Sequence, residues 1–214
     1  MDEPTAGLDS KMSQEVMELA DQLCENGTTV IISTHDVDLA YAWAEEIHVI
    51  RFGKLIYSGP SEGFYGDPVL VNSTGVMQPS MFVINKGLAE MKGLPEMPYP
   101  RTESQLISKI VSGNKGSLKV IPFGGTFTDD IKDMIENRPE GCMAGLYGMM
   151  SRKSSFDARL PFDFVFNGFE SSMAECLKGR DAIPLCDEDC IDLIESKIET
   201  LKSFESNVEY TIIK

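Results

Sequence analysis

The first 35 residues of the chain constrain its fold more than any other stretch. Two adjacent carboxylates, Asp2 and Glu3, stand at the start, and an apolar run rich in β-branched residues, 28–33, follows about one helix later and leads into His35. A run this apolar is typical of a strand that is buried on both faces. We therefore expect an α/β fold in which the acids and the histidine lie at the ends of successive strands.

Two neighbouring carboxylates repel each other, and a bound metal ion is the usual reason for both to stay ionised. In phosphoryl transfer, one acid helps to hold Mg²⁺ while the other orients or deprotonates the attacking water. A histidine at the end of the next strand can reach the same terminal phosphate as a donor. A lone Asp-Glu pair, in contrast, is more often a solvated surface turn.

Two motifs in this stretch resemble those of a known family. Residues 2–9, Asp-Glu-Pro-Thr-Ala-Gly-Leu-Asp, resemble the Walker B end and D-loop of ABC-transporter ATPases, and residues 33–36, Ser-Thr-His-Asp, resemble their switch-histidine loop. The sequence of residues 33–44 is similar to that of the ATPase subunits of cobalt/nickel energy-coupling-factor importers. The two motifs stand in the family's order and at its separation, and the resemblance covers residues 1 to about 59.

The resemblance implies an ATPase that converts ATP and water to ADP and phosphate with ATP and Mg²⁺ as cofactors. It implies that Asp2 helps to hold Mg²⁺ and that Glu3 is the general base for the hydrolytic water. His35 is the second implied catalytic residue, in contact with the γ-phosphate. Asp9 is implied to act in cofactor binding, at the interface that couples two ATPase subunits. The implied partners are a second ATPase subunit, in a homo- or heterodimer, and transmembrane transporter subunits.

The phosphate-gripping parts of such an ATPase are absent from the sequence. No P-loop of the form G-x-x-x-x-G-K-[ST] occurs, and neither does a signature of the Leu-Ser-Gly-Gly-Gln type. A P-loop holds phosphates with backbone N–H groups and a lysine. We therefore expect the chain to be the C-terminal part of a longer ATPase subunit, and not to bind ATP well or turn it over alone.

The charge of the chain limits its partners. The formal net charge is −15, and residues 1–59 carry eleven acids against three bases. This balance argues against nucleic acid as a partner. Five cysteines without a signal peptide suggest a reducing compartment, and no apolar run approaches the ~20 residues that span a bilayer. We expect a cytoplasmic protein that reaches the inner face of the cell membrane only through partners.

Three domains are predicted along the chain. Residues 1–59 are the C-terminal part of the ATPase domain, with helices over 10–26 and 36–46, a strand over 28–33 and a hairpin around Gly53. A piece of about 60 residues whose strands lack neighbours is marginal, so we expect it to be loose or partner-dependent. Residues 60–116 are a connector with short helices from Pro79 and Glu103. Residues 117–214 are an accessory α/β domain with a mainly parallel sheet, whose predicted elements are strands over 118–123, 142–147, 163–166, 181–186 and 208–213 and helices over 130–135, 170–178 and 189–204.

Several features of the second half resemble sites. Gly124-Gly125-Thr126 could hold an anion at a helix N-terminus, but two acids follow at once and favour a simple turn. Cys186 and Cys190 could bind a divalent metal, although an acidic helix start explains the residues between them.

Four other features have a plainer interpretation. The sulfur-rich stretch of Cys142, Met143, Met149 and Met150 is expected to fill core gaps. Residues 151–154 are basic and stand where a strand-end loop of a parallel sheet would place ligand contacts, but a solvated loop is the favoured interpretation. We expect His48 to be structural and Trp43 to pack the second helix onto the sheet.

A function of another class stays open beside the importer ATPase. The C-terminal α/β region can be a non-catalytic regulatory or interaction module, and the ATPase remnant before it would then be inert.

Overall fold

The computed structural model describes residues 1–204 and 208–213, which form two compact units. We call the first the sheet unit; it comprises Met1, Glu3–Ile32 and Ile107–Lys214, apart from the residues outside the description. We call the second the hairpin unit; it comprises Asp2 and Ser33–Leu106. The predicted domain boundaries at residues 59 and 116 do not coincide with this division and stay a prediction.

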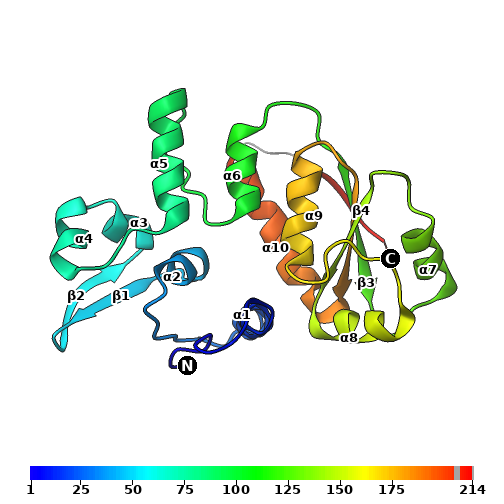
Figure 1. The fold of residues 1–214 in the computed structure, drawn as a ribbon, viewed down its shortest axis with the longest axis horizontal. Helices are drawn as coiled ribbons and strands as arrows, with labels where there is room; N and C mark the ends of the chain where they lie inside the picture. The colour runs from blue at the N-terminus through cyan, green and yellow to red at the C-terminus, as the bar shows by residue number, and fades with distance from the viewer. Residues whose placement is uncertain (205–207, 214) are drawn as a thin grey trace. The chain divides into compact units, whose positions relative to one another are not determined.

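The sheet unit is built on one parallel sheet with the strand order β4-β5-β3-β6 (Figure 1). Its strands are β3 (Ser117–Phe123), β4 (Met143–Tyr147), β5 (Ala182–Asp187) and β6 (Glu209–Ile212). All three strand pairs are parallel, so every connection between them is a crossover. The predicted α/β fold with a parallel sheet is confirmed.

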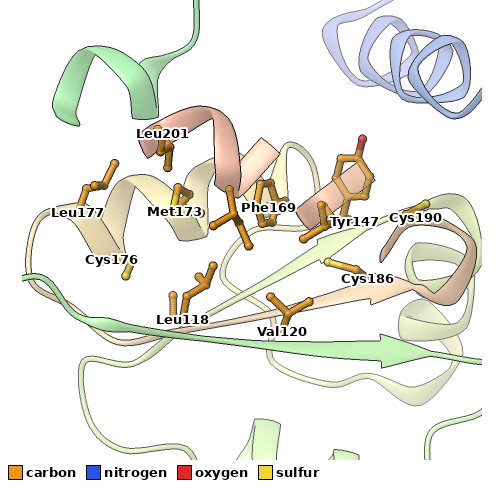
Figure 2. Packing of buried hydrophobic residues seen from close by; sticks show 13 residues of the cluster. Leu118, Val120, Tyr147, Phe169, Met173, Cys176, Leu177, Cys186, Cys190 and Leu201 are labelled. Atoms are coloured by element: carbon orange, nitrogen blue, oxygen red, sulfur yellow. The ribbon is translucent and has the colours of Figure 1, made fainter. Parts of the chain in front are cut away.

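Helices cover both faces of this sheet. The helices of this unit are α1 (Ser10–Glu25), α7 (Asp129–Glu136), α8 (Met149–Ala158), α9 (Gly168–Leu177) and α10 (Ile191–Thr200), with 3-10 turns at Glu188–Cys190 (η1) and Leu201–Phe204 (η2). Of these, α1 contacts α8 and α10. One apolar cluster lies between the sheet and α9, α10 and η2, and a second lies between the sheet and α7. Figure 2 shows the first cluster, in which Phe169, Met173 and Leu177 of α9 face Leu118 and Val120 of β3.

The hairpin unit has a small aromatic core. Its elements are α2 (Val37–Trp43), β1 (Ile47–Arg51), β2 (Lys54–Gly59), α3 (Ser61–Tyr65), α4 (Pro68–Thr74) and α5 (Ser80–Lys92), and α6 (Glu103–Ile110) spans the boundary between the units. Tyr41 is fully buried and makes edge-on contacts with Tyr65 and Phe82, at ring-centroid distances of 5.9 Å each. Tyr41 therefore anchors α2, a role that the sequence had suggested for the half-buried Trp43.

The β1–β2 hairpin turns where the sequence predicts it. Phe52 and Gly53 both have positive φ, 49° and 72°, which is the conformation that a two-residue hairpin turn of type I′ requires. The two predicted connector helices are confirmed as α5 and α6, whereas α3 and α4 were not predicted. In α6 the Gln105 side chain accepts a hydrogen bond from the Arg101 backbone N–H at 2.7 Å, as a capping residue does.

The predicted strand over residues 28–33 is wrong. Only Ser33 makes a β-bridge, parallel to Asp2, and no strand of the described residues pairs with 28–32. An extended run becomes a strand only beside a partner that takes its backbone hydrogen bonds. The predicted strand over 163–166 is likewise reduced to one bridge, between Phe164 and Gly145.

A helix that the sequence reasoning missed also corrects one site interpretation. Residues 151–154, expected as a solvated basic loop, lie inside α8, where Ser151 and Arg152 are buried. The predicted long helix over 189–204 is divided into η1, α10 and η2.

Candidate functional site

One backbone contact joins the start of the acidic motif, residues 2–9, to the start of the histidine motif, residues 33–36. The backbone of Asp2 forms a parallel bridge with Ser33, and the Ser33 hydroxyl donates a hydrogen bond to Asp2 Oδ1. Met1 N adds a hydrogen bond to the carbonyl oxygen of Ile31 at 2.6 Å. The chain therefore places the start of the first motif beside the start of the second, in the parallel orientation expected for successive strands of an α/β sheet.

Glu3 is held in an unusual backbone conformation. Its φ is 44°, in the left-handed region, and its carbonyl oxygen accepts a hydrogen bond from Ala6 N at 3.0 Å. A non-glycine residue in this region costs about 1–3 kcal/mol, and such residues cluster at functional sites. The Glu3 side chain is half-buried.

Asp9 begins the helix that follows. It is the N-cap of α1, and its Oδ1 accepts a hydrogen bond from Met12 N at 2.8 Å. The carboxylate satisfies one of the backbone donors that a helix start leaves without an intrahelical partner.

His35 lies in a short loop fixed from both sides. The exposed imidazole follows Thr34, whose hydroxyl accepts a hydrogen bond from Asp36 N at 3.1 Å. Asp36 then caps α2 by accepting from Leu39 N at 3.0 Å. His35 belongs to the hairpin unit and Glu3 to the sheet unit, so neither unit contains both implied catalytic groups.

The side chains near Asp2 fit Mg²⁺ only as part of a ligand set. Among the described residues there is no group of three or more histidine, cysteine or acidic side chains that could hold a metal ion. Mg²⁺ is usually bound by one or two carboxylates together with substrate phosphate oxygens and water. The Asp2 carboxylate suits that partial role, and the remaining ligands would come from nucleotide and solvent.

The glycine-rich turn after β3 is filled by the protein's own carboxylates. A Cβ on Gly124 would lie 2.9 Å from Glu188 Oε1. The Asp187 carboxylate lies at the start of α8, where its oxygens accept hydrogen bonds from Met150 N at 2.8 Å and Ser151 N at 2.7 Å. Since negative charge already occupies this end of the sheet, the simple-turn interpretation of residues 124–126 is the one the geometry supports.

The two cysteines in β5 and in the 3-10 turn after it belong to the core. Cys186 and Cys190 are 0% and 1% exposed, and burial raises the pKa of both thiols, to about 12 for Cys190. Protonated, buried thiols are poor metal ligands. In the sulfur-rich stretch, Cys142 is buried as expected, but Met149 and Met150 are 60% and 40% exposed, so the core interpretation is wrong for these two methionines.

A buried ion pair between α1 and α8 was missed altogether. The Arg152 guanidinium binds both carboxylate oxygens of Glu18, at 3.1 Å and 2.7 Å. The two residues are 134 positions apart, and a glutamate among helical apolar residues gives no signal of burial. Only the interruption of the apolar pattern of α1 could have pointed to it.

Comparison with known proteins adds the family. The energy-coupling factor transporter ATP-binding protein EcfA2 of Methanospirillum hungatei is 36% identical over 194 residues, which is 86% of this chain and 49% of that protein. EcfA2 of Lacticaseibacillus paracasei is 35% identical over 112 residues, covering 52% of this chain and 38% of that protein. The homologues of this chain are ABC transporter ATP-binding proteins. Because the first match takes in 86% of the chain, similarity to ABC transporter ATP-binding proteins continues well beyond residue 59.

The chain spans about half the length, or less, of these ABC transporter ATP-binding proteins. EcfA of Methanosphaera stadtmanae is 39% identical over 79 residues, 37% of this chain. No protein-family model matches the sequence, and no solved structure matches it. None of the helices in residues 1–204 and 208–213 has the length and apolar character needed to cross a membrane.

Proposed function

We propose that residues 1–59 form the acidic side of the nucleotide site in the ATP-binding subunit of an ABC importer of the cobalt/nickel energy-coupling type. The observation that carries the proposal is the parallel contact between Asp2 and Ser33, which brings together the two motifs that such a site uses. The names of the homologues support the broader class of ABC transporter ATP-binding protein.

In this proposal each group has one task. Asp2 would hold Mg²⁺, and the ion would neutralise charge on the phosphates when bound. Glu3, which has a left-handed backbone conformation, accepts a proton from the attacking water. His35 donates to the terminal phosphate from a loop that Thr34 and Asp36 hold, and Asp9 lies at the contact with a second ATPase subunit.

The chain is proposed to act as the C-terminal part of such a subunit, with the P-loop supplied by a further polypeptide segment. Its assembly with a second ATPase subunit and with transmembrane subunits would hold it at the inner face of the membrane.

The test is reconstitution. The release of phosphate from ATP in the presence of Mg²⁺ is measured for the purified chain alone and for its mixture with a segment that bears a P-loop. That segment is made from the reading frame upstream of Met1 or, failing that, from the homologous part of a relative. We expect no turnover by the chain alone, and activity in the mixture that Glu3→Gln abolishes and Glu25→Gln, an exposed acid of α1, leaves unchanged. Turnover by the chain alone that Glu3→Gln abolishes would contradict the proposal, as would a mixture whose activity survives that substitution.

A second candidate is a regulatory or interaction module with an inert ATPase remnant. It is favoured by the sheet unit, which has a complete parallel sheet and two apolar clusters of its own. An unchanged partner or ligand affinity after joint Asp2→Asn and Glu3→Gln substitution, together with an inactive mixture, would support this alternative.

A further inference from the structure

Helix α1 lies on the sheet unit with its polar side inward. Glu18 and Ala20 are its buried residues, whereas Met12, Leu19 and Leu23 are 40% to 48% exposed. A surface helix normally buries its apolar stripe and exposes its charges. Apart from Ala20, the fully buried contact of α1 is therefore made by the charged Glu18 and not by a large apolar side chain.

The inward side of α1 is held by one two-pronged ion pair. Arg152 of α8 is 4% exposed, and its two terminal nitrogens each meet one oxygen of Glu18. A second acid, Glu15, has Oε1 3.9 Å from Arg152 Nε. Paired, planar contacts of this kind fix both distance and orientation, which a lysine or a single hydrogen bond does not.

Weaker contacts extend the attachment along the helix. Lys11 Nζ lies 4.6 Å from the ring centroid of Phe166, Asp21 pairs with Lys197 at 3.0 Å, and Gln22 donates a hydrogen bond to Cys190 Sγ at 3.1 Å. These partners come from α10, η1 and the segment before α9, so several parts of the sheet unit contact one helix. The attachment is polar from residue 11 to residue 22.

The attached helix is the one that Asp9 begins. Because Asp9 caps α1 through Met12 N, a shift of α1 carries Asp9 with it. We propose that Arg152 is a positioning residue, through which the C-terminal α/β region sets the place of α1 and of the segment 3–9. The meaning of that segment rests on the proposed function, but the contact itself is tested without nucleotide.

The full chain offers its own probe position. Of its five cysteines, all within the described residues, Cys24 on α1 is exposed and the other four are buried. A nitroxide label on Cys24 reports the mobility of α1 by its spectral line shape, and hydrogen exchange reports each segment. For Arg152→Met we expect a more mobile label and exchange in residues 5–26 that is faster by on the order of tenfold, with protection of β3 and β5 unchanged.

Two variants sharpen the test. Arg180→Met removes an exposed arginine that pairs with Glu175, and as the matched control it should leave the label unchanged. The double variant Glu18→Arg with Arg152→Glu swaps the two charges and should restore the order of α1 only in part. A glutamate at position 152 would also face the negative charges of Glu15 and Asp187. A purely structural role for Arg152 would instead raise exchange in the strands as well as in α1.

An unchanged label and unchanged exchange in Arg152→Met would overturn the proposal, and so would faster exchange spread evenly over sheet and helix. If Arg152→Met does not fold, Glu18→Gln takes its place, since it removes the carboxylate charge and keeps one acceptor for Arg152; an unchanged label there would also overturn it. Failure of the reconstituted ATPase would leave these readouts as they are, so the two proposals fail separately.

Discussion

Gly148 shows how one residue without a side chain permits a buried carboxylate. It precedes α8 with φ 107°, and a Cβ there would lie 2.2 Å from Asp187 Cγ. The close approach lets Asp187, which is 5% exposed, reach Met150 N and Ser151 N. The glycine and the aspartate, far apart in sequence, act as one helix cap.

Replacing this glycine should therefore be costly. We expect Gly148→Ala to lower the free energy of unfolding by about 2 kcal/mol or more, because it adds backbone strain and displaces the cap. Urea unfolding followed by circular dichroism measures the change. Gly87→Ala is the matched control: Gly87 lies inside α5 with open space around it, and the same substitution should stabilise by about 0.5–1 kcal/mol. Equal effects at the two positions would contradict the role given to Gly148.

The hydroxyl of Tyr147 is a second informative group at this scale. Tyr147 is 4% exposed, and its hydroxyl makes no hydrogen bond with the described residues. Burial, followed by the charges of Asp21 and Glu18, raises its pKa far above the usual value for tyrosine. The ring itself packs at the edge of Phe169, as Figure 2 shows.

Removing that hydroxyl should not destabilise the chain. We expect Tyr147→Phe to leave the free energy of unfolding unchanged or to raise it by about 1 kcal/mol, since a buried polar atom without a partner is lost. Tyr147→Leu, which also removes aromatic contacts, should be destabilising. A loss of more than about 1 kcal/mol in Tyr147→Phe would indicate a hydrogen bond to ordered water.

At the scale of elements, the sequence predicts the helix or strand that a segment favours by itself. The prediction fails where the structure of a segment depends on a partner segment. The strands β3, β4, β5 and β6 were predicted within one or two residues, because each is a short run with several apolar or β-branched residues and each pairs with a neighbour in one sheet. Residues 28–32 have the same composition but no neighbouring strand among the described residues. The placement of α1 could not be predicted either, since its partner Arg152 lies 134 residues away.

A pair of hydrogen bonds joins the starts of β3 and β5 and should make the sheet acid-sensitive. Asp181 accepts from the Ser117 backbone N–H at 2.8 Å and from its hydroxyl at 2.9 Å, and these bonds lower the pKa of Asp181 in the folded chain. A lowered folded pKa gives stability that is present above about pH 4, the unfolded value, and is lost as the pH falls through the folded pKa.

We expect Asp181→Asn to be less stable than the unaltered chain at pH 7, and the difference to shrink as the pH falls below about 4, through the lowered pKa of Asp181. Urea midpoints at several pH values measure it. Ser117→Ala removes one of the two donors to Asp181, so in that background Asp181→Asn should cost less stability at pH 7. A stability difference between Asp181→Asn and the unaltered chain that stays constant with pH would show that the charge of the carboxylate does not cause it.

At the scale of the whole chain, two separate sets of buried side chains support two units. Leu185 and its neighbours lie in the sheet unit, whereas Tyr41, Phe64 and Phe82 form the core of the hairpin unit. The predicted site residues are divided in the same way, with Glu3 and Asp9 in one unit and Asp2 and His35 in the other. The motif spacing could indicate the family that the chain resembles, but not how its buried side chains would divide into separate clusters.

Each unit should therefore lose its protection separately. We expect Leu185→Ala, which empties part of the sheet core at a cost of about 2–5 kcal/mol, to speed hydrogen exchange in the sheet unit alone. Tyr41→Ala should do the same in the hairpin unit alone. Segment-resolved exchange at two pH values checks both, and equal acceleration across the chain in either variant would show a single cooperative fold.

The carboxylate of Asp187 has a consequence for the behaviour of α8 in a cell. Phosphate compounds and nucleotides vary widely in concentration there, and a helix that needed one of them at its first turn would form and melt with supply. Since α8 has an anion supplied by its own chain, its first turn needs no bound metabolite to satisfy Met150 N and Ser151 N. Arg152, the next residue of α8, is therefore presented to Glu18 without the help of a bound anion.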